Sequence, residues 1–250
     1  MSFLDGPTPI AFAHRGFDLF GAENSMVAFQ GAIDLGYRYL ETDVRVTADG
    51  VALAFHDARL DRVTDRRGVV ARLPWAQVRH ARIGGREPIP LLADVLATWP
   101  DACVNLDVKA DHSLAATLDA IRASGSIDRV CVGAFSDARV AAVRRAFGSR
   151  LCTALGPREA VALRLTSRVG RRPRAGAGLC AQVPARLGGL VFTDRRLVTT
   201  AHEMGLQVHA WTVNDADEMA RLLDLDVDGL MTDRADVLRD VLLRRGKWWT

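Results

Sequence analysis

The chain has 250 residues, of which 49% are hydrophobic and 25% are charged. This composition is typical of a globular protein, and the length allows one large domain or two small ones with a full hydrophobic core. The net charge is +3, from 33 basic and 30 acidic residues. Because both signs are spread along the whole chain, the charge pattern disfavours a dedicated nucleic-acid-binding protein.

No stretch approaches the roughly 18 uninterrupted apolar residues of a membrane-spanning helix. The first nine residues also lack the basic and apolar regions of a signal peptide. The four cysteines lie in separate apolar runs, without the C-x-x-C spacing of zinc sites; they are Cys103, Cys131, Cys152 and Cys180. We therefore expect small buried thiols in a cytoplasmic protein whose cysteines are reduced.

The first part of the chain alternates short β-rich runs with a helical pattern. In chain order, the predicted elements are a strand over residues 10–13, a helix over 25–35 and a strand over 39–46. The pair Asp49-Gly50 predicts a turn into a further extended run over residues 51–55. From about residue 57 to residue 90, arginine, glycine and proline interrupt every periodic pattern, which predicts a small insertion after the second strand.

The rest of the chain repeats a strand-then-helix order. Further strands are predicted over residues 103–108, 130–135, 151–155, 179–183, 208–213 and 229–232. Helices are predicted over residues 91–98, 113–123, 138–147, 197–204, 216–223 and 235–243, with a basic loop around 171–174. With the two earlier strands this makes eight predicted strands alternating with helices, the number of strands that closes a (β/α)8 barrel, and we expect residues 1–250 to form one domain. A doubly wound open sheet is the alternative, because a strand count from sequence can be wrong by one or two.

Polar side chains gather at or just after the carboxyl ends of the predicted strands. The residues in these positions are His14, Arg15, Glu41, Asp43, His56, Asp107, Lys109 and Trp211. In a (β/α)8 barrel the carboxyl ends of all strands meet at one mouth, where active sites lie. The placement of these residues therefore favours the barrel over the open sheet.

Three carboxylates in this set suggest a cation site. Glu41 and Asp43 are two residues apart on one strand, so both side chains face the same side. Paired carboxylates are costly to bury unless a cation or a hydrogen-bond network offsets their charge. Asp107 adds a third oxygen ligand from another strand, and such hard ligands suit Mg²⁺ or Ca²⁺ better than zinc. The alternative is a structural network in which nearby arginines pair with the carboxylates.

The remaining polar residues suit phosphate chemistry. His14 and His56 each follow an apolar strand residue; alone, each would more often be a core residue, but together they can serve as general acid and base. Arg15 and Lys109 can hold phosphate oxygens or pair with the carboxylates. Trp211 either packs against the organic part of a substrate or fills space.

A basic and aromatic tail closes the chain over residues 244–250. It carries Trp248 and Trp249 after Arg244, Arg245 and Lys247. Such a tail can contact a membrane surface or pack on the barrel, and we expect packing.

These segments together resemble the glycerophosphodiester phosphodiesterases. The matching motifs, in order, are Ala13-His14-Arg15-Gly16, Glu23-Asn24-Ser25, Glu41-Thr42-Asp43-Val44, Thr47-Ala48-Asp49-Gly50, His56-Asp57 with Leu60, Arg62 and Thr64, residues 105–109, Trp211-Thr212-Val213-Asn214 and residues 229–234. Each motif alone is weak evidence, but the ordered set spans nearly the whole chain.

The resemblance implies an enzyme that splits a small glycerophosphodiester into an alcohol and glycerol 3-phosphate. The implied roles are a divalent cation on Glu41, Asp43 and Asp107, acid and base at His14 and His56, and phosphate binding by Arg15 and Lys109. It also implies that a neighbouring hydroxyl of the substrate attacks phosphorus and forms a cyclic phosphate that water then opens.

The sequence departs from the family pattern at three places, and two other functions are alternatives to the one that the resemblance implies. Ser25 replaces the usual Thr, Asp107 replaces the usual Glu, and residues 133–136 match only loosely, which leaves head-group selectivity open. A phospholipase D-like or cyclising lyase activity on lysophospholipids is the second enzymatic hypothesis. A barrel that binds ligand without turnover is the non-enzymatic one. The sequence does not decide the oligomeric state.

Overall fold

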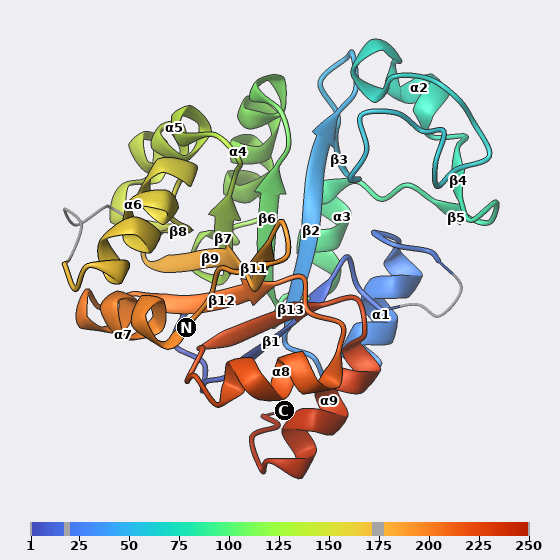
Figure 1. Cartoon of the computed structure of the whole chain (residues 1–250). Coiled ribbons are helices and arrows are strands. Elements are labelled where there is room, and N and C mark those ends of the chain that lie inside the picture. Colours follow the sequence, from blue (N-terminus) through green and yellow to red (C-terminus); the bar gives the residue numbers. More distant parts are fainter. Residues whose placement is uncertain (1, 18–20, 172–177, 250) are drawn as a thin grey trace.

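The computed structural model describes residues 2–17, 21–171 and 178–249. Its centre is a barrel of parallel strands (Figure 1). Within the described residues, eight strands form this barrel in the spatial order β8 (Cys152–Thr153), β7 (Val130–Gly133), β6 (Cys103–Val108), β2 (Tyr39–Val46), β1 (Ile10–His14), β13 (Gly229–Thr232), β12 (Gln207–Trp211) and β9 (Cys180–Pro184). A parallel bridge between Ala154 and Cys180 joins the first and last of these strands, so the barrel is nearly closed. The predicted (β/α)8 barrel is confirmed, and the open sheet is wrong.

Helices follow the strands and cover the outside of the barrel (Figure 1). They are α1 (Met26–Asp34), α3 (Leu92–Thr98), α4 (Leu114–Ala123), α5 (Asp137–Phe147), α6 (Pro157–Arg168), α7 (Arg195–Glu203), α8 (Ala216–Leu223) and α9 (Ala235–Arg244). Short polar residues begin several of them: the Ser25 hydroxyl accepts a hydrogen bond from the Ala28 N–H at the start of α1. Such a cap satisfies a backbone donor that has no partner inside the helix.

Helix α6 is an element that the sequence pattern does not predict. The pair Gly156-Pro157 reads as a helix breaker, yet here it begins the helix. Proline costs little in the first turn, where its missing N–H would have no partner. The Glu159 carboxylate accepts a hydrogen bond of 2.7 Å from the Gly156 N–H and completes the start of the helix. The basic loop expected around residues 171–174 lies, apart from Arg171, outside the described residues.

The segment after β2 is the predicted insertion, at the upper right of Figure 1. It contains β3 (Ala52–Ala54), the 3-10 turn η1 (Val70–Arg72), α2 (Trp75–Val78), β4 (Arg82–Ile83) and β5 (Glu87–Pro88). β3 pairs antiparallel with β2, and the Phe55 N–H donates to the Asp43 carbonyl at 2.9 Å. This pairing brings His56, the next residue, to the carboxyl end of β2.

Shorter elements complete the fold. They are η2 (Asp111–Ser113), η3 (Ile127–Arg129), η4 (Gly148–Arg150) and the hairpin of β10 (Arg186–Leu187) and β11 (Leu190–Val191). None of the helices in the described part of the chain combines the length and the apolar character that crossing a membrane requires.

Apolar side chains fill the barrel at the amino ends of its strands. Phe3, from the N-terminal segment, is fully buried, and its ring packs on those of Phe12 and Tyr39 at centroid distances of 6.1 and 5.3 Å. His209 also lies in this region, 5.0 Å from the Phe12 ring, and burial lowers its pKa to about 3, so it stays neutral. This end of the barrel is packed core, which leaves the opposite end for chemistry.

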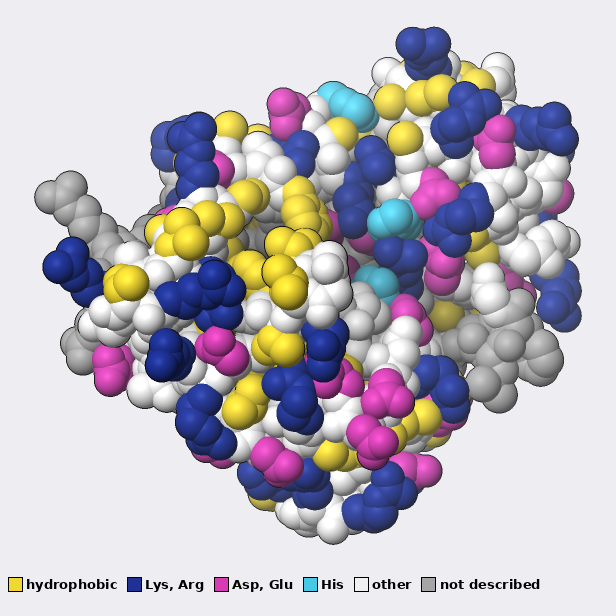
Figure 2. All heavy atoms as spheres, in the orientation of Figure 1, with side chains coloured by type: hydrophobic (Ala, Val, Ile, Leu, Met, Phe, Trp, Pro, Cys, Tyr) yellow, Lys and Arg dark blue, Asp and Glu magenta, His cyan; other side chains and the backbone are white. Residues whose placement is uncertain are grey.

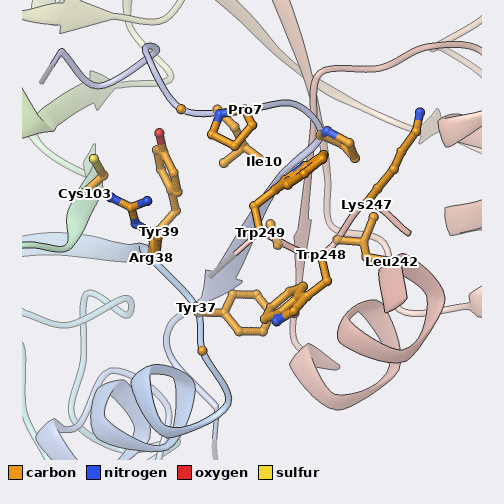
Figure 3. A pocket seen from close by; sticks show the side chains of 14 residues that line it. Pro7, Ile10, Tyr37, Arg38, Tyr39, Cys103, Leu242, Lys247, Trp248 and Trp249 are labelled. Atoms are coloured by element: carbon orange, nitrogen blue, oxygen red, sulfur yellow. The ribbon is translucent and has the colours of Figure 1, made fainter. Parts of the chain in front are cut away.

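The C-terminal tail packs on the amino end of the barrel. Figure 3 shows Trp248 and Trp249 lying near Tyr37 and Pro7 in a small cleft. The Trp248 ring lies 5.0 Å from the Tyr37 ring, whereas Trp249 is 45% exposed. The tail therefore lies away from the carboxyl ends of the strands. Packing of the tail is what the sequence analysis expects, and contact of the exposed Trp249 ring with a lipid surface remains the alternative.

The turn after β1 depends on a close approach to helix α1. Gly16 has a φ of +81°, and a Cβ added there would lie 2.6 Å from the Ala28 carbonyl carbon. Gly125, at the end of α4, has a similar φ of +64° with open space around it. Glycine avoids the strain that a side chain would cause in the left-handed backbone conformation at both positions. At Gly16 it also avoids a clash with the backbone of α1, whereas at Gly125 there is no such clash.

We expect Gly125→Ala to lower the free energy of unfolding by about 1–2 kcal/mol, the cost of the left-handed conformation. Gly16→Ala should lose about 1–3 kcal/mol more, because α1 must move away. Urea unfolding of both variants measures the difference. Equal losses would show that the approach of α1 does not constrain this turn.

Candidate active site

A cavity of about 410 Å³ opens at the carboxyl ends of the strands. All eight residues singled out from the sequence line it: His14, Arg15, Glu41, Asp43, His56, Asp107, Lys109 and Trp211. In Figure 2 histidine, acidic and basic side chains meet in the middle of the molecule, with apolar side chains beside them. The barrel thus brings together side chains that are nearly 200 positions apart in the chain.

His14, the last residue of β1, is held between two carboxylates. Its Nδ1 lies 2.5 Å from Asp233 Oδ1, and its Nε2 lies 3.7 Å from Glu41 Oε2. Burial lowers the pKa of His14, but the charge of Glu41 and the hydrogen bond to Asp233 outweigh burial and raise the pKa above its usual value. The ring is therefore oriented, and its protonated form is favoured.

Asp233 is a functional candidate to which the sequence analysis assigns no role. Asn214 holds it on two sides: Asn214 Nδ2 donates to Asp233 Oδ2 at 2.8 Å, and the Asp233 N–H donates to Asn214 Oδ1 at 2.9 Å. Asp233 and Asn214 both lie in motifs that carry the family resemblance. Membership of those motifs is the sequence signal that could have identified them as functional candidates. They orient His14 from behind, as a carboxylate does for a histidine in other hydrolytic sites.

His56 has a carboxylate partner of its own. His56 Nδ1 lies 2.6 Å from Asp57 Oδ1. Arg62 donates to Asp57 Oδ2 at 2.7 Å and to Glu23 Oε1 at 2.7 Å. The hydrogen bond from Arg62 holds the pKa of Asp57 at about 2. Asp57 thus stays ionised, and the insertion is tied to the loop before α1.

The three carboxylates line the same cavity with little access to water. Glu41 is 4% exposed and Asp43 is 1% exposed. Burial raises the pKa of Glu41 to about 7; His14 opposes this rise, while Asp43 and Asp107 add to it. Burial also raises the pKa of Asp107. The cluster therefore needs positive charge to stay ionised at neutral pH.

Two basic side chains supply part of that charge. Lys109 Nζ lies 2.7 Å from Asp43 Oδ1 and 2.6 Å from Asp107 Oδ2. Arg15 Nε lies 3.0 Å from Asp43 Oδ2. Burial alone would raise the pKa of Asp43, but Lys109 and Arg15 outweigh it and lower the pKa. The sequence left open whether the carboxylates bind a cation or pair with basic side chains. Around Asp43, pairing with basic side chains is present.

The acidic cluster also has the donors that a hard cation needs. Among the described side chains, Asp107 Oδ1 is buried without a hydrogen-bond partner. The raised pKa of Glu41 shows that its carboxylate is not fully compensated. Three carboxylates with an unused oxygen match the ligand chemistry of Mg²⁺ or Ca²⁺, so the residues present fit a divalent cation.

One wall of the cavity is apolar. Its side chains are Phe135, Val161, Leu187, Phe192 and Trp211. Phe135 is 67% exposed, and its ring meets that of Trp211 edge to face at 5.6 Å. The cavity therefore combines a charged half, which suits a phosphate, with an apolar half, which suits the organic part of a ligand.

A sequence model described as the glycerophosphoryl diester phosphodiesterase family matches residues 14–237. A protein of Mycobacterium tuberculosis named "Probable glycerophosphodiester phosphodiesterase 2" is 44% identical over 99% of this chain and 96% of its own length. The chain belongs to this family. It is accordingly an enzyme, a phosphodiesterase, and family membership speaks against a barrel that binds without turnover.

Solved structures agree on the fold of this phosphodiesterase. A putative glycerophosphoryl diester phosphodiesterase from Silicibacter pomeroyi superposes with a TM-score of 0.81 at 24% identity, covering 98% of this chain and 97% of that one. A phosphodiesterase from Oleispira antarctica, solved with the product sn-glycerol-3-phosphate, gives a TM-score of 0.78 at 19% identity, covering 94% and 97%.

The phosphodiesterase has two lysines, one in the cavity and one on the C-terminal tail. Replacing each in turn tests whether Lys109 balances the charge of the buried carboxylates. Lys109→Met leaves Asp43 and Asp107 buried without their shared cation, and we expect it to lower the free energy of unfolding by about 3 kcal/mol. Lys247→Met, on the exposed tail, should have little effect. Urea unfolding in the presence of a chelator measures both. Equal stability of the two variants would contradict the charge balance described here.

Proposed function

We propose that this phosphodiesterase hydrolyses glycerophosphodiesters to an alcohol and glycerol 3-phosphate, with a divalent cation and with His14 and His56 as acid and base. The observation that carries the proposal is the pair of histidines in one cavity, each with its Nδ1 next to a carboxylate. The name of the Mycobacterium tuberculosis relative and the product bound to the Oleispira antarctica protein support the choice of substrate class.

The proton transfers follow from the surroundings of the two histidines. The hydrogen bond between His14 and Asp233 orients the ring and favours its protonated form, so His14 suits the acid that protonates the leaving alkoxide. His56 then takes the proton of the attacking hydroxyl, which belongs to the glycerol part of the same substrate. An attack within one molecule benefits from high effective molarity. The roles reverse when water opens the cyclic phosphate.

Arg15 and Lys109 are the proposed partners of the non-bridging phosphate oxygens. Both now pair with Asp43 at the edge of the cavity, so a bound phosphate would compete with that carboxylate for them. A divalent cation on Glu41, Asp43 and Asp107 would supply charge neutralisation and polarise a phosphate oxygen. Trp211 lies on the apolar wall, where it would contact the organic part of the substrate.

The apolar wall favours a second candidate substrate. An exposed Phe135 beside Trp211 offers more apolar surface than a small polar alcohol needs, and it suits the acyl chain of a lysophospholipid. A phospholipase D-like or cyclising lyase action on such lipids would use the same histidines. Phosphorus NMR of the products separates these outcomes, because a lyase stops at the cyclic phosphate.

Substitution of either histidine tests the acid–base assignment. His14→Ala and His56→Ala should each reduce kcat by about 10²–10⁴-fold with unchanged circular dichroism. His80→Ala, an exposed histidine in the insertion, serves as the matched control and should keep full activity. The assay follows release of glycerol 3-phosphate from a panel of glycerophosphodiesters. Near-normal turnover by either cavity variant would refute its role.

Removal of divalent ions tests the cation. Treatment with a chelator should lower activity by about 10²-fold or more, and Mg²⁺ or Ca²⁺ should restore it. Asp107→Asn should raise the cation concentration needed for half-maximal activity, because one of the three charged ligands is lost. Asp236→Asn, on α9 outside the cavity, is the control. Full activity in excess chelator would remove the cation from the mechanism.

A further inference from the structure

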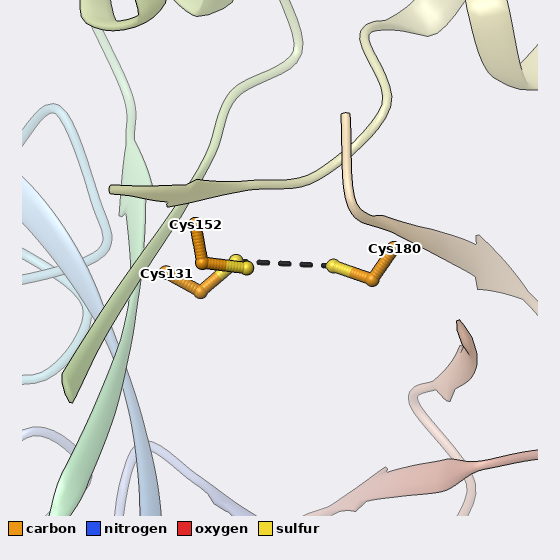
Figure 4. Close-up of side chains that lie close together, drawn as sticks. All are labelled: Cys131, Cys152 and Cys180. Atoms are coloured by element: carbon orange, nitrogen blue, oxygen red, sulfur yellow. Dashed lines mark hydrogen bonds between the residues drawn. The ribbon is translucent and has the colours of Figure 1, made fainter. Parts of the chain in front are cut away.

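Three of the four cysteines meet inside the barrel, in what we call the thiol cluster: Cys131, Cys152 and Cys180. They come from β7, β8 and β9, which follow one another around the barrel. Cys131 and Cys152 are register partners, and the bridge from Cys180 to Ala154 joins β9 to β8. Figure 4 shows the three thiols pointing toward one another.

The spacing of the sulfurs is that of ligands around one ion. All three Sγ atoms lie within 4.8 Å of one another, and those of Cys131 and Cys180 are 3.9 Å apart. At the centre of an equilateral triangle with this edge, an ion would be about 2.3 Å from each sulfur, which is the length of a metal–thiolate bond. No side chain has to move far to complete such a site.

The thiol cluster is buried in the interior of the barrel. Cys131 and Cys180 are fully buried and Cys152 is 5% exposed, among apolar side chains that include Phe12 and Met231. Thiolates are costly to bury in such surroundings unless a cation offsets their charge.

The thiol cluster lies directly beneath the floor of the active-site cavity. Ala154 and Gln182 line that cavity, and each lies two residues after a cluster cysteine on its strand. Gln182 Nε2 donates to Asn105 Oδ1 at 2.8 Å and lies 4.0 Å from Cys131 Sγ. The Gln182 amide therefore lies between the cavity and the Sγ atom of Cys131.

We propose that the thiol cluster is a binding site for a soft monovalent cation, Cu(I), held by three sulfurs in a trigonal plane. Structural zinc sites take four protein ligands, whereas the described residues bring only three metal-binding donors together here. Soft thiolates also favour Cu(I) over the hard cations that suit the carboxylates above. A thiol that becomes a thiolate ligand releases one proton to solvent, one such thiolate balances the single charge of Cu(I), and copper stays Cu(I), so no electron acceptor is required.

Anaerobic titration with Cu(I), supplied as its acetonitrile complex, tests the site. The intact protein should bind one equivalent, with new ultraviolet thiolate-to-copper absorption, and retain it against a chromogenic Cu(I) chelator. X-ray absorption of the loaded protein should show three sulfur atoms at about 2.3 Å from copper. This measurement needs no variant, so it decides the question even if a substituted barrel fails to fold.

Substitutions assign the ligands. Cys131→Ser and Cys180→Ser should each weaken Cu(I) binding at least 100-fold, as judged by competition with the chelator. Cys103→Ser is the matched control, because Cys103 is also buried but lies outside the thiol cluster, and it should bind as the unsubstituted protein does. Loss of binding in the Cys103 variant, no retained copper in the intact protein, or tighter retention of Zn²⁺ than of Cu(I) would overturn the proposal.

Discussion

The mouth of the barrel depends on the balance of charge around three inward-facing carboxylates. Parallel pairing sets Glu41 beside His14 and sets Asp107 beside Asp43. Since every second residue of a strand faces the interior, these side chains cannot turn away without shifting the register of β2. Buried carboxylates without positive charge beside them tend to become neutral, and burial raises the pKa of Glu41 to about 7. Basic side chains at this end are therefore what keeps Asp43 ionised.

Those basic side chains are the ones that phosphate chemistry also requires. Lys109 lies between Asp43 and Asp107, and Arg15 reaches Asp43 from a backbone with a φ of +58°, which is unusual for a residue with a side chain. Arg15 and Lys109 therefore compensate the charge of the buried carboxylates and also line the cavity, where they can interact with an anionic ligand. Strain at Arg15 is offset by the hydrogen bond from its N–H to the Glu41 carbonyl.

The sequence predicts the barrel and the site because both rest on local periodicity. Apolar runs that end in His14 or in Asp43 mark a strand and its carboxyl end, and a barrel gathers such ends by geometry. Supporting residues such as Asp233 and Arg62 follow no comparable rule, since their partners are set by loop geometry. His209 lies in a strand too, yet it is buried two residues deeper than the mouth and stays neutral. Depth along the strand, which composition does not encode, separates a core histidine from His14.

The interior layers of the barrel explain why the thiol cluster is also invisible in the sequence. Its cysteines are one strand–helix unit apart, so no short chelating motif joins them. The Gln182 amide, which donates to Asn105 Oδ1, lies between the cavity that it lines and the Sγ atom of Cys131. A cation entering from the mouth would meet the oxygens first, so the proposed sites would sort a hard ion to the carboxylates and Cu(I) to the sulfurs both by position and by softness.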